Sequence, residues 1–259
     1  MNGYIRKIVA VILSLIFCVA VIVGVGVIFS VRNVNIEYIY YSEDGQASSS
    51  RTYADYVTSA DNLNALKGQS LVLLSMADVE SCVSGRFISV QSCNKVFPST
   101  LDIVLKERVE QFCRPNSSGG FDVYDSEGVY MLSRQENLNP ADDSPDVLVY
   151  AQDESFSYVV QICGYFNQSF GSLRNLVRSA SVSHDAILGS DNITLSLYSG
   201  LSIVIYDYDE YAEQKISAVY EIYDGLSESQ KLRGSIYAVS RSGSSSAPYA
   251  AYYNSELGY

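Results

Sequence analysis

The sequence has 259 residues, of which 47% are hydrophobic and 18% are charged, and its formal net charge is −12. This length allows one or two domains with real hydrophobic cores, and the acidic balance argues against nucleic-acid binding, which needs a basic surface. His184 is the single histidine, which argues against histidine-based catalysis and multi-histidine metal sites.

The N-terminal region contains one long uncharged segment. Arg6 and Lys7 precede residues 8–31, which carry no charge and end before Arg32. As a helix this segment is about 36 Å long, enough to cross a hydrocarbon core of about 30 Å. A secretory signal has a shorter apolar core, of about 7–15 residues, followed by a small-residue cleavage site. We therefore expect an uncleaved transmembrane helix over residues 8–31 after a tail of residues 1–7.

The charges around this helix predict its orientation. Arg6 and Lys7 lie close to the membrane, which favours a cytoplasmic N-terminus and places the residues from Arg32 onward outside. No second apolar run approaches membrane length, so we expect a single-pass protein of the cell membrane. Ala20 and Gly24 have the small-xxx-small spacing that lets helices approach closely, which makes them weak candidates for packing against another transmembrane helix.

The cysteines allow two interpretations. Cys18 falls inside the predicted span, and the outer part contains Cys82, Cys93, Cys113 and Cys163. An outer compartment permits disulfides, and four cysteines allow three full pairings, among which a Cys82–Cys93 bridge is one candidate. The other interpretation is that they are buried apolar residues, and we expect Cys113 and Cys163 to be buried and free.

The first part of the exterior, residues 32–108, predicts one compact unit. Alternating and helical hydrophobic patterns give the order strand, helix, helix, strand, strand. The expected elements are a strand over 31–41, a polar loop over 42–52, helices over 53–66 and 76–84, and strands over 87–97 and 100–108. This order predicts two helices on one face of a three-stranded sheet.

The second part, residues 109–241, predicts an α+β domain of mostly antiparallel strands with helices on one face. The expected elements are a strand over 109–114, hairpins over 121–132 and 193–206, helices over 154–166 and 209–226, and a last strand over 235–241. Asp207 or Asp209 can cap the second helix. The Ser-rich and Tyr-rich residues 242–259 that follow predict a flexible tail.

Residue types that carry chemistry are sparse. Ser183, His184 and Asp185 include the types of a catalytic triad, but adjacent residues do not point at one another as triad partners must, so we expect a solvated loop histidine. The acidic groups Asp142-Asp143 and Asp207/Asp209/Glu210 lack EF-hand spacing, and no Lys-Ser or Lys-Thr follows Gly119-Gly120 as in a phosphate loop. We expect no enzyme activity, no cofactor, no metal and no small-molecule substrate.

Several segments resemble one protein family. The stretch FPSTLDIVLKER, Phe97–Arg108, is similar to the sequence that closes the POTRA domain of the FtsQ/DivIB family of bacterial cell division proteins. Phe29–Ile36 and Leu66–Ser75 upstream, and Tyr124–Val129 downstream, resemble further family segments in the same order. The polar insert Tyr41–Arg51 departs from the family, which has a short turn there.

This resemblance implies a POTRA domain over 32–108, a β domain over 109–241, and a non-catalytic scaffold at the division septum. Such a protein binds the single-pass FtsB/DivIC-like and FtsL-like division proteins and helps control septal peptidoglycan synthesis. In the family the last strand contacts FtsB/DivIC, and we expect an exposed edge strand here, formed by Ser235, Ile236, Tyr237, Ala238, Val239, Ser240 and Arg241. Val239 stands where the family often has an acidic residue.

Two alternatives remain open from the sequence. One is a POTRA-containing envelope protein of transport or secretion, although such units come in tandem before a barrel. The other is an envelope enzyme or sensor whose site carries no recognised motif.

Overall fold

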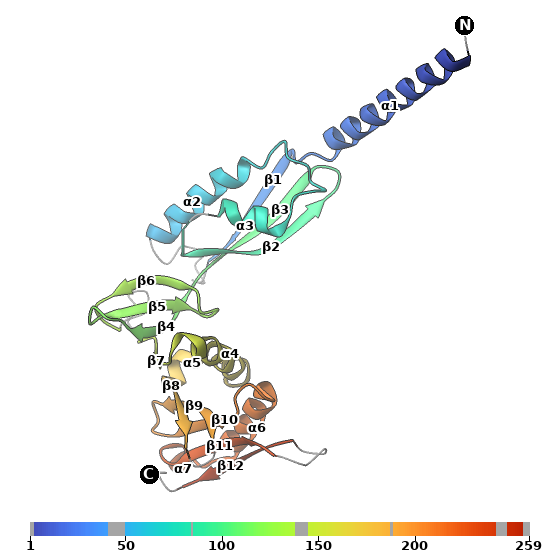
Figure 1. Ribbon diagram of the computed structural model, residues 1–259. Helices are drawn as coiled ribbons and strands as arrows, with labels where there is room; N and C mark the ends of the chain where they lie inside the picture. The colour runs from blue at the N-terminus through green and yellow to red at the C-terminus, as the bar shows by residue number, and fades with distance from the viewer. Residues whose placement is uncertain are drawn as a thin grey trace. The chain divides into compact units, whose positions relative to one another are not determined.

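The computed structural model describes residues 3–40, 50–83, 85–137, 145–186, 189–241 and 248–255. The fold is α+β, as predicted: an N-terminal apolar helix, a three-stranded sheet with helices, and a nine-stranded mixed sheet with helices packed on it (Figure 1). The chain divides into two compact units, Met1–Arg108 and Val109–Tyr259.

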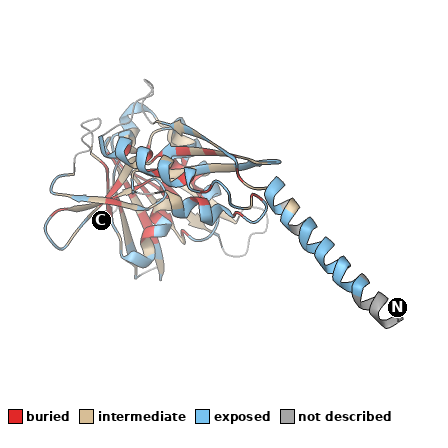
Figure 2. Ribbon diagram, turned by 90° about the horizontal axis from the view of Figure 1, so that it is seen from above, coloured by how far each residue is buried: buried red, intermediate tan, exposed pale blue. Residues whose placement is uncertain are grey.

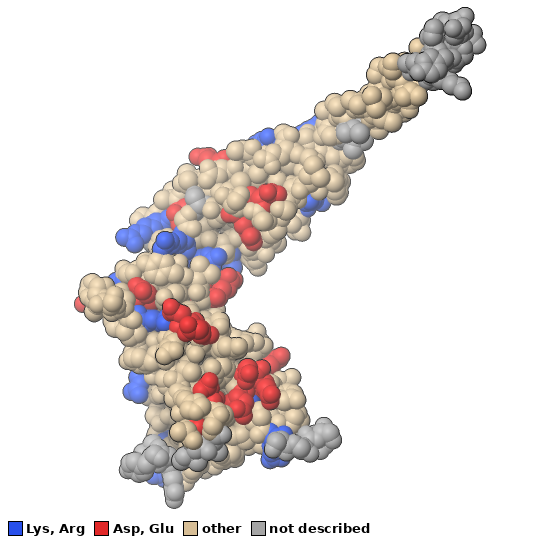
Figure 3. All heavy atoms as spheres, viewed as in Figure 1, with Lys and Arg blue, Asp and Glu red and all other residues tan. Residues whose placement is uncertain are grey.

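Helix α1, Gly3–Ile28, is the apolar helix. Its segment Val11–Ile28 has a mean hydropathy of 3.1, and none of it is buried in the chain. Figure 2 shows this helix exposed along nearly all of its described length, and Figure 3 shows its described surface without charge. Exposed apolar surface of this extent is unfavourable in water, so α1 has the length and composition of a membrane-crossing helix.

The first unit contains the five predicted elements in the predicted order. They are β1 Asn33–Ile39, α2 Ser50–Asn64, α3 Met76–Cys82, β2 Ile88–Val96 and β3 Thr100–Glu107. The strand order is β1-β3-β2, with β3 parallel to β1 and antiparallel to β2. Leu101, Ile103 and Leu105 of β3 are buried, because alternate residues of this central strand point to the face covered by the helices.

The second unit is built on the nine-stranded sheet. The strand order is β12-β11-β10-β9-β8-β7-β4-β5-β6, and the pairs β10–β11, β4–β7 and β7–β8 are parallel while the others are antiparallel. Its elements are β4 Glu110–Pro115, β5 Phe121–Asp125, β6 Tyr130–Arg134, β7 Val147–Tyr150, α4 Asp153–Phe170, α5 Leu173–Leu176, β8 Val177–Asp185, β9 Ser190–Leu197, β10 Ser202–Tyr206, α6 Ala212–Gly225, α7 Glu228–Lys231, β11 Ser235–Ser240 and β12 Tyr249–Asn254.

The core of this unit lies between the sheet and helices α4 and α6. Val159, Cys163 and Phe166 repeat at helical spacing along α4 and are fully buried, as are Ile216 and Val219 of α6. An apolar stripe at this spacing holds a helix against a sheet. The sheet contributes the inward residues of β8, β9, β10 and β11 to the same cluster.

All five cysteines are free. Cys113 and Cys163 are buried, as predicted, and burial raises the pKa of each thiol to about 12. The candidate Cys82–Cys93 bridge is wrong for this structure. Cys82 instead donates its thiol hydrogen to the carbonyl of Asp78, one turn earlier in α3, at 3.3 Å.

Candidate functional site

The segment predicted as an exposed edge strand is an interior strand. Residues 235–240 form β11, which pairs with β10 on one side and with β12 on the other, and Arg241 follows it. Part of the tail predicted as flexible, Tyr249–Asn254, forms β12 and takes the edge. The prediction failed because β11 has backbone N–H and C=O groups on both sides, and a returning strand satisfies the outer row.

The register of β12 determines which of its backbone groups point outward. Arg241 N–H donates to the carbonyl of Pro248 at 2.7 Å, and the ladder continues with Ala238 opposite Ala251 and Val239 opposite Ala250. Hydrogen-bonded and non-hydrogen-bonded pairs alternate in an antiparallel ladder, so Ala250 directs its N–H and C=O toward β11. Ala251 therefore directs its own away from β11, toward the open edge, and the same alternation applies to Tyr249 and Tyr253.

The composition of β12 distinguishes it from the other edge strands. Among the described residues, the two sheets have four edges, and β1, β2 and β6 carry Glu37, Lys95 and Arg134 respectively. The sequence of β12 is YAAYYN, without a charge. Because charged residues on an edge oppose pairing with another chain, β12 is the edge that lacks this barrier.

A row of stacked tyrosines leads to this edge. Tyr206 of β10, Tyr237 of β11 and Tyr252 of β12 have ring centroids 6.5 and 5.4 Å apart, with interplanar angles of 22°. Tyr252 is 50% exposed at the end of the row. A strand added to β12 would place side chains beside Tyr252, and aromatic residues of this kind often anchor protein interfaces.

On the face of the sheet opposite Tyr252, the side chain of Tyr253 fixes the position of β12. The Tyr253 hydroxyl donates to the carbonyl of Arg233, in the turn before β11, at 3.1 Å and to that of Gln230, in α7, at 3.3 Å. The Tyr253 side chain also packs against the core cluster. The edge is therefore ordered before a partner arrives, which lowers the entropic cost of binding.

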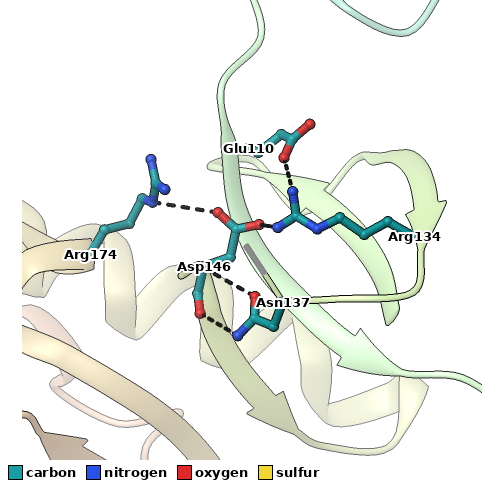
Figure 4. A network of polar contacts seen from close by, with 5 residues as sticks. All are labelled: Glu110, Arg134, Asn137, Asp146 and Arg174. Carbon is teal, nitrogen blue, oxygen red and sulfur yellow. Dashed lines mark hydrogen bonds and ion pairs between the residues drawn. The ribbon is translucent and has the colours of Figure 1, made fainter. Parts of the chain in front are cut away.

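A buried ionic network lies near the other end of the nine-stranded sheet (Figure 4). Asp146, fully buried, forms ion pairs with Arg134 and with Arg174, the latter at 3.4 Å, and Arg134 also pairs with Glu110 at 2.5 Å. Asn137 exchanges two hydrogen bonds with the backbone of Asp146. Burial raises the pKa of Asp146 to about 6, although the two arginines act in the opposite direction. The charges of these groups compensate one another, although Arg134 Nε and Asp146 Oδ1 form no hydrogen bond with any described residue. We interpret the network as structural.

The segment Ser183-His184-Asp185 lies at the end of strand β8, and not in the loop that the sequence predicted. His184 is exposed, and its Nδ1 lies 2.7 Å from Asp191. Ser183 donates to Asn192 at 2.9 Å, and Asp185 accepts from the Tyr206 hydroxyl at 3.1 Å. The three residues therefore bond to three different partners and do not form a triad.

The acidic segment after β10 does not cap the helix that follows it. Helix α6 begins with Tyr211 as its N-cap and without a side-chain capping bond, so the predicted cap by Asp207 or Asp209 is wrong. The carbonyl of Asp207 accepts a hydrogen bond from the buried ammonium of Lys215 at 2.7 Å, and burial lowers the pKa of Lys215. Across the described ranges, no group of three or more His, Cys, Asp or Glu side chains could hold a metal.

Two predictions stay untested by the fold. Nothing lies within 4 Å of a Cβ added at Gly24, so packing of Ala20 and Gly24 against another helix stays a prediction. Asp142 and Asp143 lie outside the described residues, as does most of the 41–51 insert.

A scan against protein-family models and a search of curated proteins each found no match for this chain.

Proposed function

We propose that this chain is a membrane-anchored, non-catalytic scaffold of bacterial cell division, similar to the FtsQ/DivIB family. It binds FtsB/DivIC-like and FtsL-like single-pass proteins outside the membrane, at the division septum. Through them it helps control septal peptidoglycan synthesis. The support comes from the order of the parts: an apolar helix, a three-stranded unit with two helices, and a larger strand-rich unit.

The short connection between α1 and the first unit supports a role in binding membrane proteins. Val31, three residues beyond the end of α1, is buried in the first unit, and its carbonyl accepts a hydrogen bond from Gly68 N–H at 2.8 Å. The folded unit therefore begins almost directly after the helix. An uncleaved helix would confine the protein to two dimensions and raise the effective concentration of membrane-bound partners.

The observation that carries the proposal is the uncharged, ordered edge of β12. An extended partner segment can add to such an edge, with backbone hydrogen bonds giving affinity and side-chain contacts giving specificity. The outward groups of Tyr249, Ala251 and Tyr253 supply the hydrogen bonds, and Tyr252 supplies an aromatic contact. This edge takes the place of Ser235–Ser240 as the docking strand.

Two proline variants test the edge. Ala251→Pro removes an outward N–H, and proline is tolerated at such positions of edge strands. Ala250→Pro removes an N–H that bonds to β11, so it damages the sheet itself. We expect Ala251→Pro to weaken binding of the outer segment of an FtsB/DivIC-like protein by about two- to tenfold, since one backbone bond worth about 0.5–1.5 kcal/mol is lost.

Binding is measured with the full chain in nanodiscs, and folding by circular dichroism. Ala250→Pro is expected to lower the unfolding midpoint more than Ala251→Pro does. A folded Ala251→Pro variant that binds as tightly as wild type would show that β12 is not the docking edge. The division role is tested separately with a fluorescent fusion in dividing cells, where a mid-cell band is expected and an even rim would contradict the proposal.

A further inference from the structure

We propose that the first unit has a second contact with the membrane, made by exposed apolar side chains beside the end of α1. These residues, Val72, Leu73, Val96 and Phe97, are called the apolar collar below. These side chains insert into the lipid headgroup region and keep the first unit in contact with the bilayer. The inference rests on the proposed membrane anchor and not on the role in division.

A hydrogen bond and a ring contact hold the collar next to the C-terminal end of α1. Phe29 directly follows Ile28, the last residue of the helix, and its carbonyl accepts a hydrogen bond from Leu71 N–H at 2.7 Å. The ring of Phe29 lies edge-on to the ring of Phe97, with centroids 5.7 Å apart. Figure 1 shows the start of β1 and the β2–β3 turn at the same end of the three-stranded sheet.

The collar side chains are unusually exposed for their size. Leu73 is 82% exposed, Phe97 57%, Val72 53% and Val96 46%. They come from two separate segments, the loop after α2 and the β2–β3 turn, which are joined by a hydrogen bond from Lys95 Nζ to the carbonyl of Val72 at 3.2 Å. An apolar group of this kind on one end of a unit marks an interaction site.

The depth of the collar points to lipid as its partner. The eighteen-residue apolar segment ending at Ile28 is about 27 Å long as a helix, close to the hydrocarbon thickness. The headgroup region adds roughly 5–7 Å on each side, and the chain advances at most about 3.5 Å per residue. Phe29 and the loop bonded to it therefore lie within the headgroup region.

The charges around the collar fit the same position. Lys95 sits between the two collar segments, and the Arg32 guanidinium turns back to the carbonyl of Val27 in the last turn of α1, at 3.5 Å. Basic side chains at this level meet lipid phosphates while apolar neighbours enter the acyl boundary. The positive charge of Lys95 contributes to lowering the pKa of Asp78, whose carboxylate accepts hydrogen bonds from Ser75 in the cap of α3.

The chain contains no tryptophan, so a single introduced one reports its own surroundings. The test uses the full chain with Leu73→Trp, reconstituted in phosphatidylcholine–phosphatidylglycerol vesicles that contain shallow brominated lipid. The matched control is Tyr53→Trp, which is also exposed and lies in the first turn of α2. Tyr56, one turn later, bonds to the carbonyl of Ile39 at the far end of β1, about 20 Å from the membrane end of that strand.

We expect blue-shifted emission and strong quenching by bromine for Leu73→Trp, and neither for Tyr53→Trp. A Phe97→Trp variant should behave as Leu73→Trp does, and circular dichroism shows that each variant is folded. Intact mass and co-flotation with vesicles confirm that α1 is present and inserted, so a failed anchor is recognised separately. Unquenched red emission from Leu73→Trp in floated vesicles would overturn the inference. Blue-shifted emission without bromine quenching would mean that protein covers the collar, and would overturn it as well.

Discussion

The two ends of the nine-stranded sheet are held together by opposite chemistry. Toward β6, buried charges join β4, β6, α5 and the residue before β7, with Asp146 between Arg134 and Arg174. Toward β12, apolar residues such as Ile236 and Ala238 fill the core, and tyrosines stack across the open face. The first end closes the sheet with a charged edge strand, and the second leaves an uncharged edge.

With docking at β12 as proposed, stability and binding depend on different parts of one sheet. A buried ionic network requires all its members to be present, because each group depends on its partners for compensation. An apolar core with an open edge tolerates a new strand, since the added strand extends a ladder that already exists. Substitutions at each end of the sheet would show whether this division holds.

Removing the central cation should cost the most. Arg134→Met leaves the fully buried Asp146 paired with Arg174 alone, at 3.4 Å, and removes the ion-pair partner of the mostly buried Glu110. Breaking a buried ion pair by removing one partner typically destabilises by about 3–5 kcal/mol. We expect a loss of that size in urea unfolding of the detergent-solubilised chain at pH 7.5. A loss below about 1 kcal/mol, the value of a surface pair, would show that the network is not structural.

The same network predicts how stability depends on pH. The pKa of Asp146 in the folded chain is about 6, above the value of about 3.9 in an unfolded chain. Between these values the folded state binds more protons at Asp146, so the contribution of Asp146 to stability should fall as the pH rises from about 4 to 6 and then level off. Arg134 lowers the pKa of Asp146, so removing Arg134 raises this pKa further. At pH 5 Asp146 is then protonated and uncharged, and the loss of unfolding free energy in Arg134→Met should be smaller than at pH 7.5. Equal losses at both pH values would contradict the assignment to Asp146.

A core substitution at the other end should be insensitive to pH. Ile236 is fully buried on β11, and Ile236→Ala is expected to cost about 3 kcal/mol through lost burial and a cavity. No titratable group is created or removed, so the same loss is expected at pH 5 and pH 7.5. If the stability loss of Ile236→Ala varied with pH as that of Arg134→Met is expected to, ionic and apolar stabilisation would not be separated between the two ends of the sheet.

Much of this architecture could be predicted from hydrophobic periodicity. Leu101, Ile103 and Leu105 alternate as a central strand should, and Val159, Cys163 and Phe166 follow helical spacing, so β3 and α4 were predicted close to their observed bounds. Strands β7 and β8 were missed. β7 has four residues, and β8 alternates small residues such as Ala180 with serines, which gives a weak signal because burial in its sheet comes from distant partners.

The sequence analysis predicted an exposed edge at residues 235–241, whereas β12 forms the edge of the sheet. The Tyr- and Ala-rich segment 249–254 follows a Ser- and Gly-rich stretch, which is typical of a flexible tail. Its strand structure depends on pairing with β11, a tertiary contact that local composition does not encode. The ionic network was also missed, because Glu110, Arg134 and Asp146 are far apart in sequence and no spacing connects them.

The smallest expected effect on stability comes from the edge tyrosine. Tyr252 is half exposed and stacks on Tyr237 alone among the aromatic pairs found. Cross-strand aromatic pairs contribute about 0.2–1 kcal/mol, so Tyr252→Ala should lower the free energy of unfolding by less than about 1 kcal/mol. Binding of the FtsB/DivIC-like segment should fall more, since aromatic anchors at interfaces often cost 2 kcal/mol or more when truncated, roughly thirtyfold in Kd. The control is Tyr150→Ala, at an exposed tyrosine of β7 in the interior of the sheet, which should leave binding unchanged. Equal binding losses in the two variants would show that β12 is not the docking edge. A binding loss confined to Tyr252→Ala would support docking at β12, separate from the ionic network that stabilises the other end of the sheet.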